Sequence, residues 1–284
     1  MSGRPAPSSV LLVECPDRPG LVHGVTGVLF RCGLNVVGNQ EFVDRAQGRF
    51  FMRTEFDGET PRQELVDAVR AVLPPTETTV RLVPREPKRI VVLATREHHC
   101  LADILVRHAF GEMNARLEAV IANHPTLERL VQRFDIPFHC LPSEGLDRET
   151  HEAGVLSLLR RHQPDYVVLA KYMRVLSPEF VRHFPARLIN IHHSFLPAFA
   201  GAKPYHRAYE RGVKIIGATA HFVTDELDAG PIIVQQVTPV DHDHGVDDLI
   251  QSGRDVEQMV LAKALKLVLE DRVFLCGNRT VIFE

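Results

Sequence analysis

Apolar strands that alternate with amphipathic helices constrain the fold of this chain more than any other feature. "RIVVLAT" is an uninterrupted apolar run of the kind that is buried on both faces of a sheet. Strand patterns follow at 115–124, 136–142, 164–172 and 186–192, and helical patterns separate them. Such β-α repeats predict an α/β domain with an open, mostly parallel, doubly wound sheet. In sheets of this kind, ligands bind beyond the carboxyl ends of the strands.

The first eighty residues show a different order of elements. The patterns run strand, helix, strand, strand, helix, strand, and "RAQG" between the middle strands is a hairpin signal. This order predicts a ferredoxin-like βαββαβ domain. "PREPKR" then has the composition of a linker. We therefore expect two domains, at residues 8–84 and 88–284.

Composition and charge exclude several classes of protein. The net charge is -3 and no apolar run reaches the length of a bilayer span, so we expect neither nucleic acid nor a membrane as partner. The N-terminus is polar and Pro-rich, without the apolar core of a signal peptide. Five cysteines, an odd number with no CxxC spacing, indicate a reduced, cytoplasmic setting.

Polar chemistry gathers where the fifth of these strands ends, in "NIHHSFLPAF". Strand alternation places Asn190 and His192 on one side and His193 on the other. In a later strand, "VKIIGATAHFV", Thr219 and His221 share a face, and the loop "TDELDAGP" that follows contains Asp228. The long helical pattern "RDVEQMVLAKALKLVLEDRV" is expected to start with a capping box at Asp255.

An amide, an imidazole and a carboxylate together suit acyl transfer at a carbonyl. Asn190 can donate a hydrogen bond to a developing oxyanion, and His192 can do the same and help proton transfer. Asp228 can hold His192 in its protonated state or orient the attacking group. No covalent nucleophile is required, and no GxSxG motif is present.

Other interpretations of these residues stay open at this point. A histidine at a strand end is often structural, and Asp228 in "DAGP" has the setting of a turn residue. His192, His193 and His206 with an acid could bind a metal, although no fixed carboxylate spacing supports it, and our prediction is no metal. "HHC" at 98–100 and "DHDH" at 241–244 are expected to be polar loop residues. A dinucleotide-dependent dehydrogenase is disfavoured because no GxGxxG follows the first strand of the sheet.

The N-terminal residues resemble a known family. "DRPGLVHGVTGVLFRCGLNVV" is similar to the opening of an ACT domain, and the resemblance covers residues 8–84. ACT domains commonly pair edge to edge and bind an amino acid at the seam. The resemblance implies a homodimer or homotetramer, with Asp17, Gly20 and Asn35 near the effector, for which glycine or methionine are guesses. Alternatively, Gly20 and Asn35 only satisfy turns.

Residues 88–284 resemble the folate-dependent formyltransferase family. "NIHHSFLPAFAGAKPYHRAYERG" and "GATAHFVTDELDAGPIIVQ" match two separated family motifs in spacing. The likeness implies a formyltransferase-type sheet with catalytic residues Asn190, His192 and Asp228, and with His193 and His221 as secondary candidates. "AKYMRVL" is similar to the segment that lines the family's folate pocket. The pteridine-lining residues implied there are Met173, Arg174, Val175 and Leu176.

Departures from the transferase pattern indicate the hydrolase branch of this family. A phosphoribosylglycinamide-type transferase carries a Gly-rich loop after its first strand, whereas "ATREHHCLAD" has no glycine. "HHS" also replaces "HPS", and the ACT-like segment is foreign to the transferase. The resemblance implies hydrolysis of 10-formyltetrahydrofolate to tetrahydrofolate and formate without a cofactor, which would balance one-carbon folate pools and supply formate for purine synthesis. The alternatives are the phosphoribosylglycinamide-type transferase and a regulatory protein that only binds folate.

Overall fold

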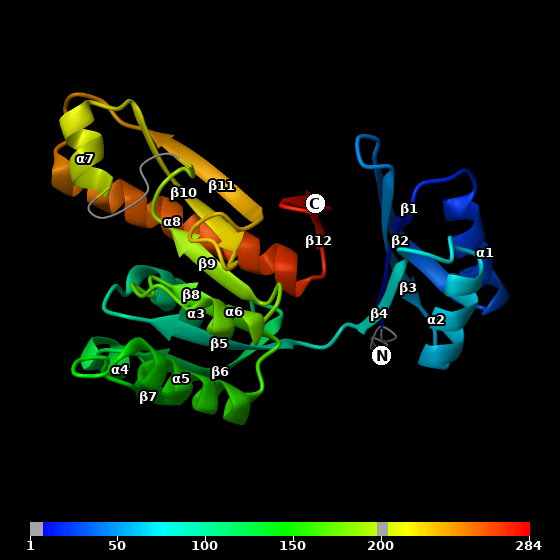
Figure 1. The fold of residues 1–284 in the computed structure, drawn as a ribbon, viewed down its shortest axis with the longest axis horizontal. Helices are drawn as coiled ribbons and strands as arrows, with labels where there is room; N and C mark the ends of the chain where they lie inside the picture. The colour runs from blue at the N-terminus through cyan, green and yellow to red at the C-terminus, as the bar shows by residue number, and fades with distance from the viewer. Residues whose placement is uncertain (1–7, 198–203) are drawn as a thin grey trace, which may run out of the picture. The chain divides into compact units, whose positions relative to one another are not determined.

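The computed structural model describes residues 8–197 and 204–284 (Figure 1). The residues left out include most of the polar N-terminal segment and, at 198–203, part of the motif that begins at Asn190. Contacts divide the chain into two compact units. The first contains the residues up to 86 together with 270–274 and 281–284, and the second contains 87–269 and 275–280.

The first unit has the predicted βαββαβ order. Its antiparallel sheet has the strand order β2-β3-β1-β4. The elements are β1 Ser8–Pro16, α1 Leu21–Arg31, β2 Asn35–Asp44, β3 Arg49–Asp57, α2 Arg62–Ala71 and β4 Thr79–Pro84. Gly20 precedes α1 with φ 88°, a backbone conformation that glycine adopts without strain. The ferredoxin-like prediction is confirmed.

Both faces of this sheet are covered, by different parts of the chain. The helices bury one face through an apolar core that includes Val25, Leu65 and Met52. On β3, Phe51 and Arg53 are also buried, and C-terminal residues pack on them. The ring of Phe274 lies 5.7 Å from that of Phe51, and Arg53 donates hydrogen bonds to the backbone carbonyls of residues 270 and 271. A stretch that is remote in the sequence thus completes the first unit.

The second unit contains a seven-stranded sheet of order β11-β10-β9-β8-β5-β6-β7. The pairs from β9 to β7 are parallel, and β10 and β11 add an antiparallel edge. Its strands are β5 Lys88–Ala94, β6 Ala115–Ala122, β7 Phe138–Cys140, β8 Tyr166–Ala170, β9 Leu188–His192, β10 Ile215–Phe222 and β11 Ile232–Pro239. The mostly parallel, doubly wound sheet is confirmed.

Helices cover both faces of this sheet. They are α3 His99–Ala109, α4 Glu128–Gln132, α5 Arg148–His162, α6 Pro178–Arg182, α7 Pro204–Arg211 and α8 Val246–Leu269, with a 3₁₀ turn at Pro125–Leu127. One face is buried by α5 and α6 through Val155, Leu159 and Phe180. Helix α8 packs on β9, β10, β11 and α3 (Figure 1). Near the C-terminus, β12 Val273–Cys276 and β13 Arg279–Ile282 pair with each other.

The start of α8 corrects the sequence analysis. The helix begins at Val246, nine residues before Asp255, so the predicted capping box is wrong. The Asp248 side chain accepts a hydrogen bond from the backbone N–H of Gly245 at 2.8 Å and so caps the true start. Asp255 lies inside the helix and accepts from Gln251 one turn earlier. In the described part of the chain, no helix is both long and apolar enough to cross a membrane.

Candidate active site

The polar residues converge where β9 meets β10. In this antiparallel pair, Thr219 lies opposite His192, and His221 lies opposite Asn190. The Thr219 hydroxyl donates to the carbonyl of Ser194 at 2.8 Å and accepts from the backbone N–H of Leu196 at 3.1 Å. Strand β10 therefore fixes both the end of β9 and the chain that leaves it.

His221 orients the amide of Asn190. Its Nδ1 lies 2.9 Å from the carbonyl oxygen of Phe222, and a carbonyl can only accept, so Nδ1 carries the proton. Burial lowers the pKa of His221, against the hydrogen bond to Phe222, and so favours the neutral ring. Its free Nε2 then accepts a hydrogen bond from Asn190 Nδ2 at 3.2 Å. The second hydrogen of that amide stays available to a ligand.

Asp228 closes the site from the loop before β11. Its carboxylate lies 3.3 Å from His192 Nδ1 and 3.9 Å from His221 Nε2. The hydrogen bond from His192 lowers the pKa of Asp228, although burial opposes this. The loop approaches β10 so closely that a Cβ on Gly230 would lie 1.8 Å from the carbonyl oxygen of Phe222, so only glycine fits there.

Asn190, His192, His221 and Asp228 line one cavity of about 410 Å³, large enough for one drug-sized ligand. His192 is 7% exposed, and its Nε2 has no hydrogen-bond partner among the described residues. The segment after β8 supplies another part of the cavity wall, with Met173, Arg174, Val175 and Leu176. Met173 and Val175 are more than half exposed, as expected for apolar side chains that an apolar ligand would cover.

The structure corrects the predicted direction of His193. Strand β9 ends at His192, so the alternation of side chains ends there too. The rings of His192 and His193 stack, with their centroids 5.0 Å apart and their planes 19° from parallel. Both line the cavity, so the prediction that they point away from each other is wrong.

Comparison with known proteins places this geometry in a family. The formyl transferase model matches residues 88–265, and the ACT domain model matches residues 9–74. The formyltetrahydrofolate deformylase of Escherichia coli K12 is 54% identical over 274 residues, which cover 96% of this chain and 97% of that protein. The crystal structure of a formyltetrahydrofolate deformylase from Pseudomonas syringae superposes with a TM-score of 0.95 at 41% identity, over 100% of this chain and 96% of that one.

The chain belongs to the formyltetrahydrofolate deformylase family. A glycinamide ribonucleotide transformylase from Symbiobacterium toebii is a more distant relative. It is 34% identical with a TM-score of 0.65, and it covers 69% of this chain and 94% of its own. The deformylases match both units of the chain, whereas the share covered by the transformylase corresponds to little more than the formyl transferase domain.

The predicted effector residues of this deformylase family member do not come together within one chain. Asp17 follows the end of β1, and Gly20 precedes α1. Asn35 and Ser8 both pair with Asp57. Asn35 therefore lies at the end of the sheet where β1 starts, whereas Asp17 and Gly20 lie where β1 ends. The length of these strands separates Asn35 from the other two by roughly 25 Å. Their role in binding an effector stays a prediction.

A largely buried group of charged and polar side chains next to the site was not predicted from the sequence. His99, Lys171, Tyr205 and Glu257, here called the Glu257 cluster, come from α3, the end of β8, α7 and α8. The prediction that "HHC" is a polar loop is wrong for His99 and Cys100, which are buried in the first turn of α3. In the sequence of α8, Glu257 lies directly beside the apolar stripe, and this position could have indicated that its charge is buried.

The partly buried imidazole of His193 should make stability depend on pH. Burial, followed by the charges of Lys171 and His192, lowers the pKa of His193 from 6.5 to about 4. Below pH 6.5 the unfolded chain takes up this proton, whereas the folded chain does so only near pH 4. The free energy of unfolding should therefore fall as the pH drops through this interval, by up to about 3 kcal/mol from His193 alone.

Urea unfolding at pH 7 and pH 4.5, followed by circular dichroism, measures this effect. His193→Asn should flatten the pH dependence relative to the wild type. His183→Asn, at an exposed histidine, should leave it unchanged. An equal pH dependence in the wild type and His193→Asn would contradict the prediction.

Proposed function

We propose that this protein hydrolyses 10-formyltetrahydrofolate to tetrahydrofolate and formate. The observation that carries the proposal is the convergence of Asn190, His192 and Asp228 on one cavity. Membership of the formyltetrahydrofolate deformylase family supports it, because relatives of that name match nearly the whole length of the chain. The cavity has the size that one folate head group needs.

Each polar group has a task in the proposed reaction. Asp228 takes a proton from water, directly or through a relay, and the water oxygen attacks the formyl carbon. Asn190 Nδ2 and the buried Nε2 of protonated His192 donate hydrogen bonds to the oxyanion that forms. The bond from carbon to N10 then breaks, N10 receives a proton through His192 or a bound water, and formate leaves. His221 keeps the Asn190 amide in place.

The segment from Met173 to Leu176 supports the orientation of the substrate in this proposal. Its apolar side chains and backbone groups face the same cavity as the polar residues. The backbone N–H of Met173 already donates to Thr95 at 3.1 Å, which fixes the segment next to the end of β5. A flat pteridine would rest against this wall, with its formyl group turned towards Asn190 and His192.

Incubation with 10-formyltetrahydrofolate tests the proposal. We expect formate and tetrahydrofolate to appear in equal amounts, at the same rate with and without glycinamide ribonucleotide. Transfer of the formyl group to that amine in preference to formate release would favour the phosphoribosylglycinamide-type transferase. Binding of the folate without turnover would favour a regulatory binding protein.

The ACT domain extends the proposal to regulation. We propose that it binds an amino acid, with glycine and methionine as first candidates, and that the chain forms a homodimer or homotetramer. The proposed reaction would take place in the cytoplasm, where it would balance one-carbon folate pools and supply formate for purine synthesis. Equilibrium dialysis with each amino acid and sedimentation of the full chain examine these points.

A further inference from the structure

The cavity of the proposed active site ends at a wall formed by Lys171 and His193. Both residues line the cavity, and both contact members of the Glu257 cluster, Lys171 through Glu257 and His193 through the ring of Tyr205. A formyl group can pass to water or to an amine, and an amine needs room beyond the formyl carbon. What fills the space behind this wall therefore bears on which acceptor can reach the substrate.

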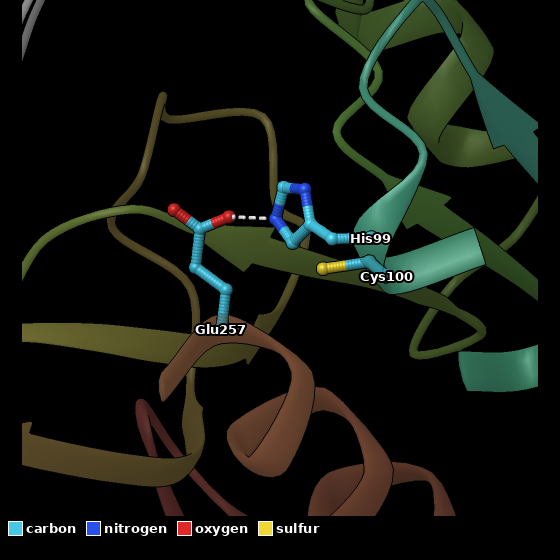
Figure 2. Close-up of side chains that lie close together, drawn as sticks. All are labelled: His99, Cys100 and Glu257. Atoms are coloured by element: carbon cyan, nitrogen blue, oxygen red, sulfur yellow. Dashed lines mark hydrogen bonds and ion pairs between the residues drawn. The ribbon is translucent and has the colours of Figure 1, made fainter. Parts of the chain in front are cut away.

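Three of the four residues of the Glu257 cluster are buried, and the Glu257 carboxylate contacts three donors. Glu257 is 1% exposed, His99 is 5% exposed and Lys171 is 8% exposed. The carboxylate lies 2.6 Å from His99 Nε2, 3.2 Å from Lys171 Nζ and 2.8 Å from the Tyr205 hydroxyl. Figure 2 shows His99 reaching across from α3 to Glu257 on α8. These three donors satisfy the charge and the hydrogen bonding of the Glu257 carboxylate.

A metal ion is the competing interpretation of this group. One ligand atom each of His99, Cys100 and Glu257 lies within 4.8 Å of the others (Figure 2). However, the ammonium of Lys171 already provides the positive charge beside Glu257. Burial and the charge of Glu257 raise the pKa of the Cys100 thiol, so it is not the thiolate that a metal would need. An internal salt-bridge network fits these contacts better.

Tyr205 is the member of the cluster that comes from α7. Its hydroxyl lies so close to α8 that a Cβ on Gly253 would approach it to 2.1 Å, and Gly253 has no side chain to prevent this. The ring centroid of Tyr205 lies 6.3 Å from that of His193. The ring thus occupies the space between α8 and the wall of the cavity.

Lys171 has an uncommon backbone conformation where it lines the cavity. Lys171 has φ 60°, a conformation that is uncommon for residues other than glycine, directly after β8. This geometry sends its side chain to Glu257 while the following residues turn to the apolar wall of the cavity. Strain of this kind persists where the surroundings fix it, often at functional sites.

We propose that the Glu257 cluster is a plug that excludes amines from the active site and leaves water as the acceptor of the formyl group. His99 and Tyr205 determine this specificity by filling the space from α3 and from α7. A water molecule fits beside the folate in a cavity of this size, whereas the substituent of a primary amine would collide with the wall. The inference rests on the proposed hydrolysis.

Competition in the wild-type protein gives the first test. Hydroxylamine and glycinamide are offered with 10-formyltetrahydrofolate, and formate and formylated amine are both quantified. We expect formate to form at an unchanged rate, with no more formylated amine than in the uncatalysed control. Enzyme-dependent formylation of either amine by the wild type would overturn the plug. If the wild type releases no formate at all, the proposed function itself fails.

Opening the plug gives the second test. Tyr205→Ala and His99→Ala each remove a ring, and Tyr205→Phe keeps the ring but loses one hydrogen bond. In an opened variant the amine nitrogen attacks the formyl carbon, the bond to N10 breaks, and N10 takes the proton that the amine loses. The ratio of formylated amine to formate should rise at least ~10-fold in the alanine variants and stay at the wild-type value in Tyr205→Phe.

The outcomes separate the plug from general damage to the protein. Circular dichroism and thermal unfolding establish which variants are folded. Folded alanine variants that still release formate with the wild-type product ratio would overturn the plug. A rise in Tyr205→Phe as large as in Tyr205→Ala would also overturn it, because it would assign the effect to the hydrogen bond and not to the space. If neither alanine variant folds, the wild-type competition decides.

Discussion

Asp228→Asn should lower kcat for formate release by about a hundredfold or more and leave KM for 10-formyltetrahydrofolate nearly unchanged. The carboxylate lies 3.3 Å from His192 Nδ1 and is the proposed acceptor of the proton from water. An amide of the same size can neither take that proton nor stabilise a charged imidazole. The apolar wall around Met173 is untouched, so folate should still bind.

Backbone conformation does not complicate this test. Asp228 has φ 54°, in the left-handed region that asparagine tolerates well. Asp135 offers a matched control because it has φ 57°, is exposed and lies outside the cavity. Asp135→Asn makes the same chemical change in the same backbone region and should keep wild-type kcat. Wild-type turnover in Asp228→Asn would refute the role assigned to Asp228.

The pH profile adds a second readout. The hydrogen bond from His192 lowers the pKa of Asp228, with burial opposing, so the carboxylate stays charged at and above its usual value of 3.8. Asp228 should therefore set no limb of the profile between about pH 5 and pH 8. Any acidic limb in that range must come from another group.

Local patterns in the sequence were sufficient for the parts of the site that lie on one strand or one loop. Asn190 and His192 are two residues apart on a strand, so the alternation of side chains alone placed them on one side. Asp228 is in a separate segment, so only its chemistry and the resemblance to formyltransferases joined it to the pair, and no short-range pattern did. The order of helices and strands in both units followed from β-α periodicity and from the hairpin signal, because these are short-range features.

The Glu257 cluster could not be predicted in this way. Its four residues come from four elements, separated by up to 158 positions in the case of His99 and Glu257. No periodicity links them, since the contact exists only once α3, α7 and α8 have packed. The packing of C-terminal residues on β3 could not be predicted for the same reason, because Phe274 contacts Phe51 only in the folded chain. The start of α8 was predicted too late because Gly253 and the polar residues before it interrupt the apolar periodicity of the first turns.

The largest expected effect on stability follows from breaking the same cluster. Glu257→Leu leaves the Lys171 ammonium buried without its counter-charge and should lower the free energy of unfolding by about 3–5 kcal/mol. The double variant Lys171→Met with Glu257→Leu removes both charges and should regain most of this loss, because apolar replacements of a buried ion pair are often neutral or better. The double-mutant cycle isolates the coupling between the two side chains.

Urea unfolding of the full chain at pH 7, followed by circular dichroism, measures each corner of the cycle. Asp255→Leu changes an exposed acidic residue two positions earlier on α8 and should shift stability by no more than about 0.5 kcal/mol.

Burial tends to raise the pKa of Glu257, but the hydrogen bond from His99 and the charge of Lys171 outweigh it and lower the pKa. The stability that this carboxylate contributes is therefore complete above its usual value of 4.5 and is lost as the pH falls through the lowered value. A loss of less than about 1 kcal/mol in Glu257→Leu, or a double variant as unstable as the single one, would contradict the view that the loss comes from an unpaired buried charge.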